Sequence, residues 1–167
     1  NTKIDSSSFL KEKFRYARFT GADITKTDFD QADIISTSFD DTKLLGVSFY
    51  KALLTYASFN TARLTTVNFT SAEFLGNAKF IGATLDSCIF DGACATRITL
   101  DQATVMSTNL TNNQMFEEGV FTGAKIDVTR MNITPMRDIR ERVLEKVLEA
   151  EELMKEEKDT RRAIFMP

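Results

Sequence analysis

Large apolar side chains recur every five residues along most of the chain. These apolar centres fall in three runs, at 9–74, 80–110 and 116–131, which are separated by slips of one residue. All of the 14 Phe residues except Phe165 occupy such centres. A period of five matches neither the 3.6-residue period of an α-helix nor the two-residue period of a β-strand. The pattern therefore indicates an internal repeat.

A small or β-branched residue lies two positions before most centres, as Ala22 does before Ile24 and Ala57 does before Phe59. In extended chain, residues two apart point the same way, so each repeat supplies a pair of inward side chains. The other three residues of the repeat are expected to face outward. The pattern predicts a short extended piece followed by a corner, repeated so that the inward pairs line a closed coil.

The centres also indicate how many sides each coil has. From 29 to 69 they alternate between Phe and aliphatic residues, which favours an even number of sides. With four sides, residues twenty positions apart would stack in columns. We expect these columns to form the structural core, with Phe9, Phe29, Phe49, Phe69 and Phe90 in one, Phe19, Phe39, Phe59 and Phe80 opposite, and Leu44, Leu64 and Leu85 in a third. The two slips are interpreted as single-residue bulges at corners near 75–79 and 111–115.

The repeat resembles that of the pentapeptide-repeat family, whose pattern is Ala, then Asp or Asn, then Leu or Phe, then two variable residues. The matching triplets are Ala22-Asp23-Ile24, Ala32-Asp33-Ile34, Ala57-Ser58-Phe59, Ala62-Arg63-Leu64 and Ala72-Glu73-Phe74. The resemblance extends from Phe9 to Met131, although Thr, Ser and Lys often replace Asp or Asn. It implies an all-β solenoid over residues 1–133, a right-handed four-sided β-helix of about six coils, each about 4.8 Å thick.

Beyond residue 133 the fivefold pattern stops and a helical one begins. Thr134-Pro135 is typical of a helix start, and residues 134–160 carry one apolar stripe. The stripe includes Ile139, Val143, Val147 and Met154. We expect a C-terminal α-helical cap over the last coil, or alternatively an oligomerisation element that forms a homodimer. Residues 161–167 are expected to form a tail.

The amino-acid composition excludes several classes of catalytic and metal site. The chain has no His and no Trp, and its 21 basic and 24 acidic residues leave a net charge of −3. Without His, the Ser-His-Asp and Cys-His sites and the common zinc-ligand patterns are excluded. No apolar run approaches the roughly 20 residues of a membrane span. We expect a soluble protein that is not an enzyme, without cofactor or metal and without nucleic acid as partner, in the cytoplasm or in an exported or lumenal compartment after removal of a leader.

Two groups of residues are candidates for a chemical site. The Asp residues between 23 and 41 follow the five-residue spacing, so they would ring the rod as a solvated surface rather than converge on a calcium or magnesium ion. Cys88 lies in an inward slot and Cys94 in an outward one, which favours two free thiols over the alternative of a disulfide.

The predicted function is a non-catalytic protein–protein interaction scaffold with an unknown protein partner. Its sides would present rows of Thr, Ser, Lys and Asp, with exposed Leu53 and Tyr50. The family resemblance implies two alternatives: a DNA-mimicking modulator of a type II topoisomerase, and a repeat module of a secreted bacterial effector. DNA mimicry requires a row of one charge sign. The outward row Asp23, Lys43 and Arg63 mixes both signs.

Overall fold

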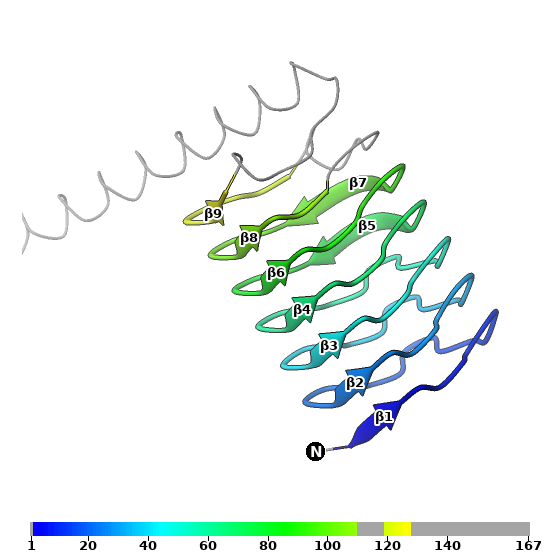
Figure 1. Ribbon diagram of the computed structural model, residues 1–167. Helices are drawn as coiled ribbons and strands as arrows, with labels where there is room; N and C mark the ends of the chain where they lie inside the picture. Colours follow the sequence, from blue (N-terminus) through cyan, green and yellow to red (C-terminus); the bar gives the residue numbers. More distant parts are fainter. Residues whose placement is uncertain (1, 110–118, 128–167) are drawn as a thin grey trace, which may run out of the picture.

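The chain winds into a rod of stacked coils, with the N-terminus at one end (Figure 1). The computed structural model describes residues 2–109 and 119–127. These residues form a parallel β-solenoid of about six turns, as the repeat pattern predicts. Among the described residues, no helix is long and apolar enough to cross a membrane.

One side of each coil carries a short strand, and these strands pair in parallel as a seven-stranded sheet. In pairing order the strands are β1 (Lys3–Asp5), β2 (Asp23–Thr25), β3 (Lys43–Leu45), β4 (Arg63–Thr65), β6 (Thr84–Asp86), β8 (Thr104–Met106) and β9 (Lys125–Ile126). Leu44 pairs with Leu64 twenty residues later, and Leu64 pairs with Leu85 twenty-one residues later, after the first slip. The predicted stacking of residues four repeats apart is therefore confirmed.

Three further ladders join the remaining sides, mostly through single parallel bridges. Their members are Ser8, Asp28, Ser48, Asn68, Ile89 and Asn109 on the second side, Lys13, Asp33, Leu53, Glu73 and Cys94 on the third, and Arg18, Ser38, Ser58, Lys79, Thr99 and Val120 on the fourth. Together with the sheet these make four ladders, so each coil has four sides.

The two residues after each centre form the corner. At most corners the second of these residues has a positive φ, as at Lys26 (φ 47°) and Tyr56 (φ 56°). At many corners the carbonyl of the centre accepts a hydrogen bond from the amide three residues later, as Phe49 does from Ala52 at 3.0 Å. A left-handed conformation costs an L-residue about 1–2 kcal/mol. The backbone hydrogen bonds between successive coils offset this cost.

The core consists of the stacked columns. Phe rings in successive coils lie nearly parallel, with centroids 5.2 Å apart for Phe29 and Phe49 and 5.0 Å apart for Phe39 and Phe59. Rings of different columns meet edge to face, at 5.5 Å for Phe39 and Phe49. Both arrangements suit the quadrupole of an aromatic ring. The fully buried members of the expected core are Phe29, Phe39, Phe49, Phe59, Phe69, Phe80, Phe90, Leu44, Leu64 and Leu85.

Thr replaces Ala in several of the small inward slots. Thr27, Thr37 and Thr42 are buried, and their hydroxyls donate to backbone carbonyls, at 2.9 Å from Thr27 to Thr25 and 2.6 Å from Thr42 to Phe39. Because each hydroxyl has an acceptor, these polar groups are tolerated inside the rod.

The first slip lies where the chain passes from the third side to the fourth, close to the predicted corner at 75–79. Strand β5 (Glu73–Lys79) pairs with β7 (Cys94–Thr99), and the register shifts between Phe74 and Asn77. In these two coils the strands continue from the third side to the fourth, and β5 and β7 form a separate two-stranded sheet. The second slip lies between Asn109 and Val120, because their ladders change from a spacing of 20 to one of 21.

Several sequence predictions fall outside the described residues. These are the capping helix over 134–160 with Ile139, Val143, Val147 and Met154, the tail over 161–167, and the exact position of the second bulge. They stay predictions.

Candidate interaction surface

The outward side chains form rows that run along the rod, one coil after another. On the seven-stranded sheet, Asp23 pairs with Lys43 and Lys43 with Arg63. On the other sides, the rows containing Asp28 and Asp33 continue with polar and apolar residues in turn. The predicted rows are thus present in the predicted register. In each of the four rows the acidic residues are absent or are separated by uncharged or basic residues, so none of these rows presents a continuous line of negative charge.

Two of the aspartates hold neighbouring coils together. Asp30 accepts a hydrogen bond from the amide of Tyr50 at 2.9 Å and Asp40 accepts one from the amide of Asn60 at 2.8 Å. Each carboxylate also accepts the hydroxyl of a Ser one coil further on. These amides follow a Phe centre and have no backbone acceptor among the described residues. The acidic side chains therefore complete the ladder at positions that the backbone leaves unpaired.

The same device recurs further along the rod with other side chains. The Asn60 side-chain carbonyl accepts the amide of Ile81 at 3.0 Å, and Asp101 accepts the amide of Thr122 at 3.0 Å. The expectation that the aspartates form only a solvated surface therefore needs refinement. In the part of the chain that the structure describes, no three His, Cys, Asp or Glu side chains lie close enough to hold a metal ion.

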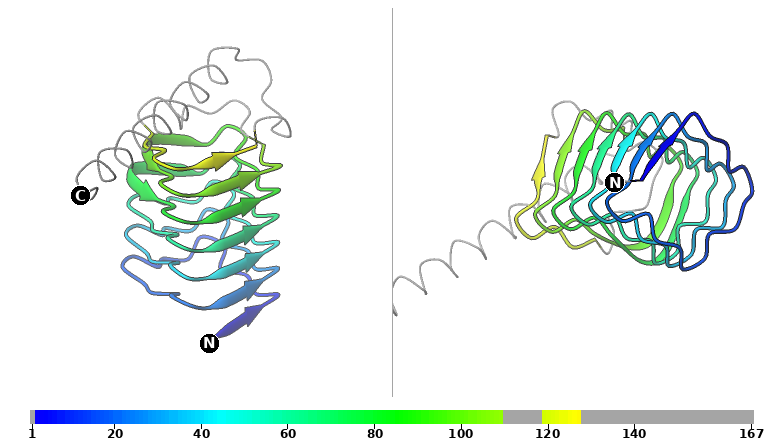
Figure 2. Two further views of the ribbon diagram at one scale, coloured as in Figure 1. Left: turned by 90° about the vertical axis from the view of Figure 1, so that its left-hand side faces the viewer. Right: turned by 90° about the horizontal axis from the view of Figure 1, so that it is seen from below.

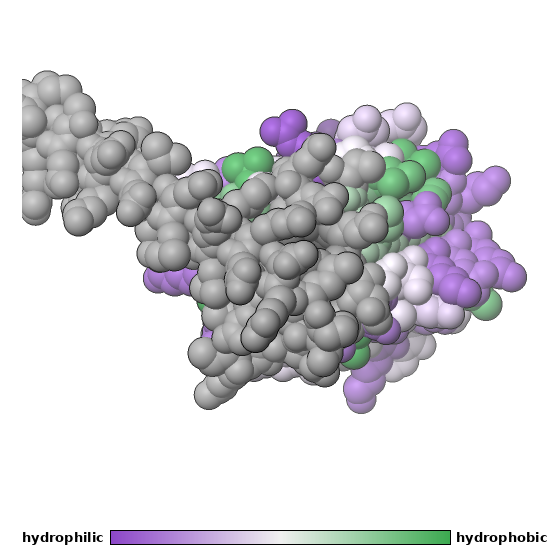
Figure 3. All heavy atoms as spheres, turned by 90° about the horizontal axis from the view of Figure 1, so that it is seen from above, coloured by the Kyte–Doolittle hydropathy of each residue, from purple (hydrophilic) through white to green (hydrophobic). Residues whose placement is uncertain are grey.

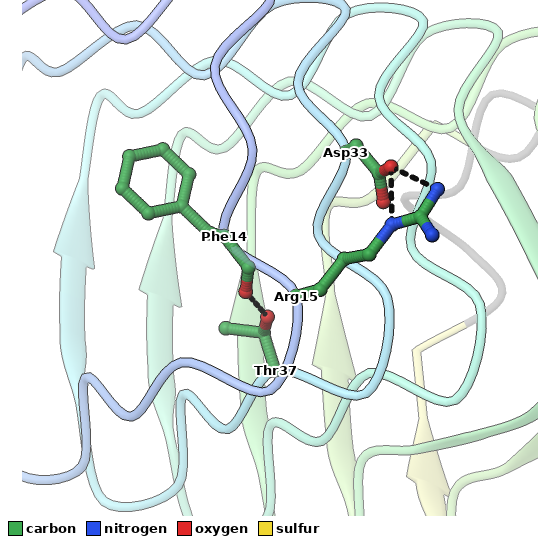
Figure 4. Close-up of polar contacts among 4 residues, drawn as sticks. All are labelled: Phe14, Arg15, Asp33 and Thr37. Atoms are coloured by element: carbon green, nitrogen blue, oxygen red, sulfur yellow. Dashed lines mark hydrogen bonds and ion pairs between the residues drawn. The ribbon is translucent and has the colours of Figure 1, made fainter.

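An ion pair links the first two coils. The guanidinium of Arg15 lies 2.6 Å from Asp33, and Nε of Arg15 also donates to the same carboxylate oxygen (Figure 4). The Arg15 guanidinium holds the pKa of the Asp33 carboxyl below its usual value. Beside this pair, the hydroxyl of Thr37 donates to the carbonyl of Phe14 across the same two coils. Both contacts fasten the first coil to the second.

Exposed apolar side chains are scattered over the sides and corners. Seen from above, hydrophobic side chains gather in small groups on a largely hydrophilic flank (Figure 3). Tyr16 (76% exposed) and Tyr56 (59%) occupy corners, whereas Leu53 and Tyr50 are only half-buried, which corrects the prediction that they are exposed. Tyr56 lies over Gly76, so close that a Cβ on Gly76 would fall 2.5 Å from its ring.

The two cysteines are free, and their environments differ as their slots predict. Cys88 is buried and Cys94 is exposed. Burial raises the pKa of the Cys88 thiol to about 12, so this thiol stays protonated and unreactive at neutral pH.

The model of the family described as "Pentapeptide repeats" matches the chain in eight copies, over residues 13–49 and 32–70. Residues 13–70 therefore consist of pentapeptide repeats. Its fold is similar to that of QnrB1, a plasmid-mediated fluoroquinolone resistance protein, with a TM-score of 0.51 and 19% sequence identity over 78% of this chain and 79% of that one. At this identity the likeness concerns the fold alone.

Two further solved pentapeptide-repeat proteins match with lower scores. HetL from the cyanobacterium Nostoc, which is involved in heterocyst differentiation regulation, has 18% identity over 73% of this chain and 59% of that one, with a TM-score of 0.29. A protein from the thylakoid lumen of Arabidopsis thaliana has 21% identity over 76% and 77%, with a TM-score of 0.31. No curated protein matches the chain.

Sequence reasoning missed two features of this rod. The first is Ile4, a centre exactly one period before Phe9, which lies in β1 and pairs with Ile24. The five-residue spacing contained that signal. The second is the role of Asp30 and Asp40 as acceptors for the next coil, which becomes visible only when the unpaired amides of Tyr50 and Asn60 are located.

Proposed function

We propose that this protein is a non-catalytic scaffold that binds a protein partner along its sides. The observation that carries the proposal is the fixed register of its outward rows. Ladder bonds join every described coil to the next, and side chains such as Asp30 and Asp40 add further links. A rigid surface of this kind presents contact residues with little loss of conformational freedom on binding.

The composition of the sides supports a protein partner more than a reaction. The rows combine hydroxyl, amide and charged side chains with separate exposed apolar residues such as Leu45 and Tyr56. Protein interfaces have this mixture of apolar anchors within a polar surround. The chain has no His, so the proposal needs no proton relay on the rod.

The experiment is site-specific photo-crosslinking in extracts of the organism that produces the protein. A photoreactive residue replaces Tyr56 at one corner, Leu45 on the seven-stranded sheet, or Ile89 on the second side. We expect one partner to be captured from one side of the rod and not from the others. Capture of the same proteins from every position, or none from any position, would contradict a side-specific scaffold.

The alternative of a DNA-mimicking topoisomerase modulator is tested separately. The mixed signs along Asp23, Lys43 and Arg63 argue against it, since mimicry of phosphates requires repeated negative charge. Supercoiling by a type II topoisomerase is measured with and without the full chain at micromolar concentration. The scaffold proposal expects no change in rate, and inhibition or protection would favour the alternative.

A further inference from the structure

The seven-stranded sheet carries two facing positive charges on its outer surface. Strands β2, β3 and β4 lie one above another on this side of the rod (Figure 2). Asp23 on β2 pairs in register with Lys3 on one side and with Lys43 on the other, so opposite charges face each other there. Lys43 pairs next with Arg63 on β4, which places two positive charges opposite each other. Like charges in such positions destabilise a sheet, so the fold gains nothing from this pair.

No carboxylate of the described residues forms an ion pair with these two side chains. Lys43 and Arg63 are both exposed, and the ion pair between the first two coils does not involve them. The acidic residues around them have other partners. Asp41, two residues before Lys43, accepts the hydroxyl of Thr61, and Asp86 on β6 accepts the hydroxyl of the residue that follows it, at 3.0 Å. The two positive charges are therefore available to a partner.

An exposed apolar side chain and a third positive charge lie beside this pair. Leu45 follows Lys43 by two residues on the same outer face of β3 and is 49% exposed. The next residue is Gly46, and a Cβ there would lie 4.0 Å from Cγ of Lys26, which comes from the neighbouring coil. Lys26 is exposed, and its stem thus runs beside the end of β3. We call Lys26, Lys43, Leu45 and Arg63 the basic patch.

The charge of the basic patch indicates an acidic partner of limited size. The chain as a whole has a net charge of −3, so the patch is opposite in sign to the rest of the molecule. A nucleic acid presents a long line of phosphates and would approach acidic residues as well as the patch. A short acidic segment of a protein can contact the patch alone, where local complementarity of charge favours its binding.

The spacing within the patch also fits an extended segment. In extended chain, residues two apart point the same way and lie about 6.6 Å apart. Lys43 and Leu45 have this spacing on β3. A segment that runs along β3 with one carboxylate between Lys43 and Arg63 therefore places the side chain two residues later over Leu45. The next side chain on that face lies toward Lys26. The matching pattern is acidic, any residue, apolar, any residue, acidic.

We propose that the basic patch binds an acidic, extended segment of a protein partner. One carboxylate of the segment contacts Lys43 and Arg63, a second contacts Lys26, and an apolar side chain between them packs on Leu45. The facing positive charges, which cost the fold stability, then serve the binding of this partner. The inference rests on the proposed scaffold function and adds to it the side that binds and the chemistry of the occupant.

The test uses the isotope-labelled full chain and the peptide Ser-Gly-Asp-Ser-Leu-Ser-Asp-Gly-Ser. Titration followed by the NMR shifts of backbone amides measures the affinity and locates the contact. We expect saturable shifts at β3, at β4 and at the corner with Gly46. A control peptide with Asn in place of both Asp residues is expected to bind at least about tenfold more weakly. Equal binding of the two peptides, shifts centred on another side, or no shifts at millimolar peptide would overturn the inference.

Matched variants separate the patch from the overall charge of the chain. The double substitution Lys43→Glu with Arg63→Glu is expected to weaken binding of the peptide at least about tenfold. The control, Lys51→Glu with Lys79→Glu, makes the same charge change at exposed positions away from the sheet and is expected to leave the affinity unchanged. Equal losses in the two variants would contradict a site at the patch, because binding would then follow net charge alone.

The single substitution Arg63→Glu tests the role of the facing charges. It places a carboxylate opposite Lys43, so it is expected to raise the midpoint of thermal unfolding while it weakens binding of the peptide. A lower midpoint would assign Arg63 to the stability of the fold, and the inference would be wrong.

Photo-crosslinking distinguishes a failure of this inference from a failure of the scaffold proposal. We expect the photoreactive residue at Leu45 to capture the partner. If Tyr56 or Ile89 captures a protein and Leu45 captures none, the scaffold proposal survives and this inference does not. Capture of nucleic acid at Leu45, or a dimer of the purified chain in sedimentation velocity that the substitutions at Lys43 and Arg63 dissociate, would also overturn the inference.

Discussion

The first coil and the inner coils share one sequence pattern but differ in burial. Phe9 and Phe49 belong to the same column, yet Phe9 is half-buried and Phe49 is 0% exposed. The difference arises because Phe49 has a coil on both sides, with ring centroids 5.2 Å away at Phe29 and 5.2 Å away at Phe69. Burial in this fold is therefore supplied by residues four repeats away and not by the local sequence.

The largest test of this comparison is truncation of the two Phe residues. Phe49→Ala removes a ring that is packed on both faces and is expected to lower the free energy of unfolding by about 3–5 kcal/mol. Phe9→Ala removes a ring packed on one face and is expected to cost about half of that. Urea denaturation of each variant gives both values. Equal losses, or a loss below about 1 kcal/mol for Phe49→Ala, would contradict the stacked columns.

The reaction rates of the two thiols test whether Cys88 lies in an inward slot and Cys94 in an outward one. Cys88 is buried with its pKa raised to about 12, while Cys94 is exposed. We expect a thiol reagent at pH 8 to modify Cys94 in the folded chain at least roughly a hundredfold faster than Cys88, which reacts only after local opening. Mass spectrometry of partly labelled protein identifies the modified residue. Similar rates at both thiols would place Cys88 outside the core.

The bulge is compared with a regular corner by two glycine substitutions. Gly76 and Gly21 both have positive φ, at 78° and 70°. A Cβ at Gly76 would meet the ring of Tyr56, whereas one at Gly21 would meet nothing within 4 Å. Gly76→Ala is therefore expected to cost about 2–3 kcal/mol and Gly21→Ala about 1 kcal/mol. Thermal unfolding measures both, and the double variant Gly76→Ala with Tyr56→Ala is expected to recover part of the loss.

Substitutions at Asp40 and Asp23 compare a carboxylate that bridges two coils with one that only faces outward. Asp40→Ala leaves the amide of Asn60 without its acceptor and is expected to cost about 1–2 kcal/mol. Asp23→Ala removes a side chain on the outer face of β2 and is expected to change the free energy of unfolding by less than about 0.5 kcal/mol. If chemical denaturation finds the two variants equally stable, the bridging role of Asp40 is wrong.

Much of the core could be predicted because the inward slots follow directly from a fixed period. The columns of Phe29 and Leu44 needed only the spacing of twenty residues. The sequence predicts the first bulge near 75–79 but not its exact residue, because an extra residue between Phe74 and Phe80 can be placed at several points without changing the columns. The structure places the register shift before Asn77, where the neighbouring strand β7 is also extended.

The surface was less predictable than the core. Leu53 and Tyr50 occupy outward slots, yet the adjacent coils, only about 4.8 Å away, cover part of each side chain. The role of Asp30 also depends on its neighbours, because it bonds the amide of a residue twenty positions later. The exposure and the hydrogen bonds of outward residues therefore depend on neighbouring coils, which the sequence of a single repeat does not show.

The smallest expected effect concerns the ion pair between the first and second coils. Because Arg15 lowers the pKa of Asp33 in the folded chain, the stability from this pair is fully present above the ordinary pKa of an Asp and is lost as pH falls through the lowered value. Arg15→Gln is expected to be slightly less stable than the unchanged chain at pH 7 and equally stable at strongly acidic pH. A difference that grows toward acid would reverse the assigned sign.

The most direct measurement is the spacing of residues along one outward row. Lys3, Thr84, Thr104 and Lys125 belong to the same ladder of the seven-stranded sheet. Spin labels are placed in pairs at Lys3 and each of the other three, with Cys88→Ala and Cys94→Ser removing the native thiols. Pulsed electron–electron double resonance should give distances of about 19, 24 and 29 Å, because each coil adds one step of about 4.8 Å. Distances that do not rise in equal steps would contradict the stacked solenoid.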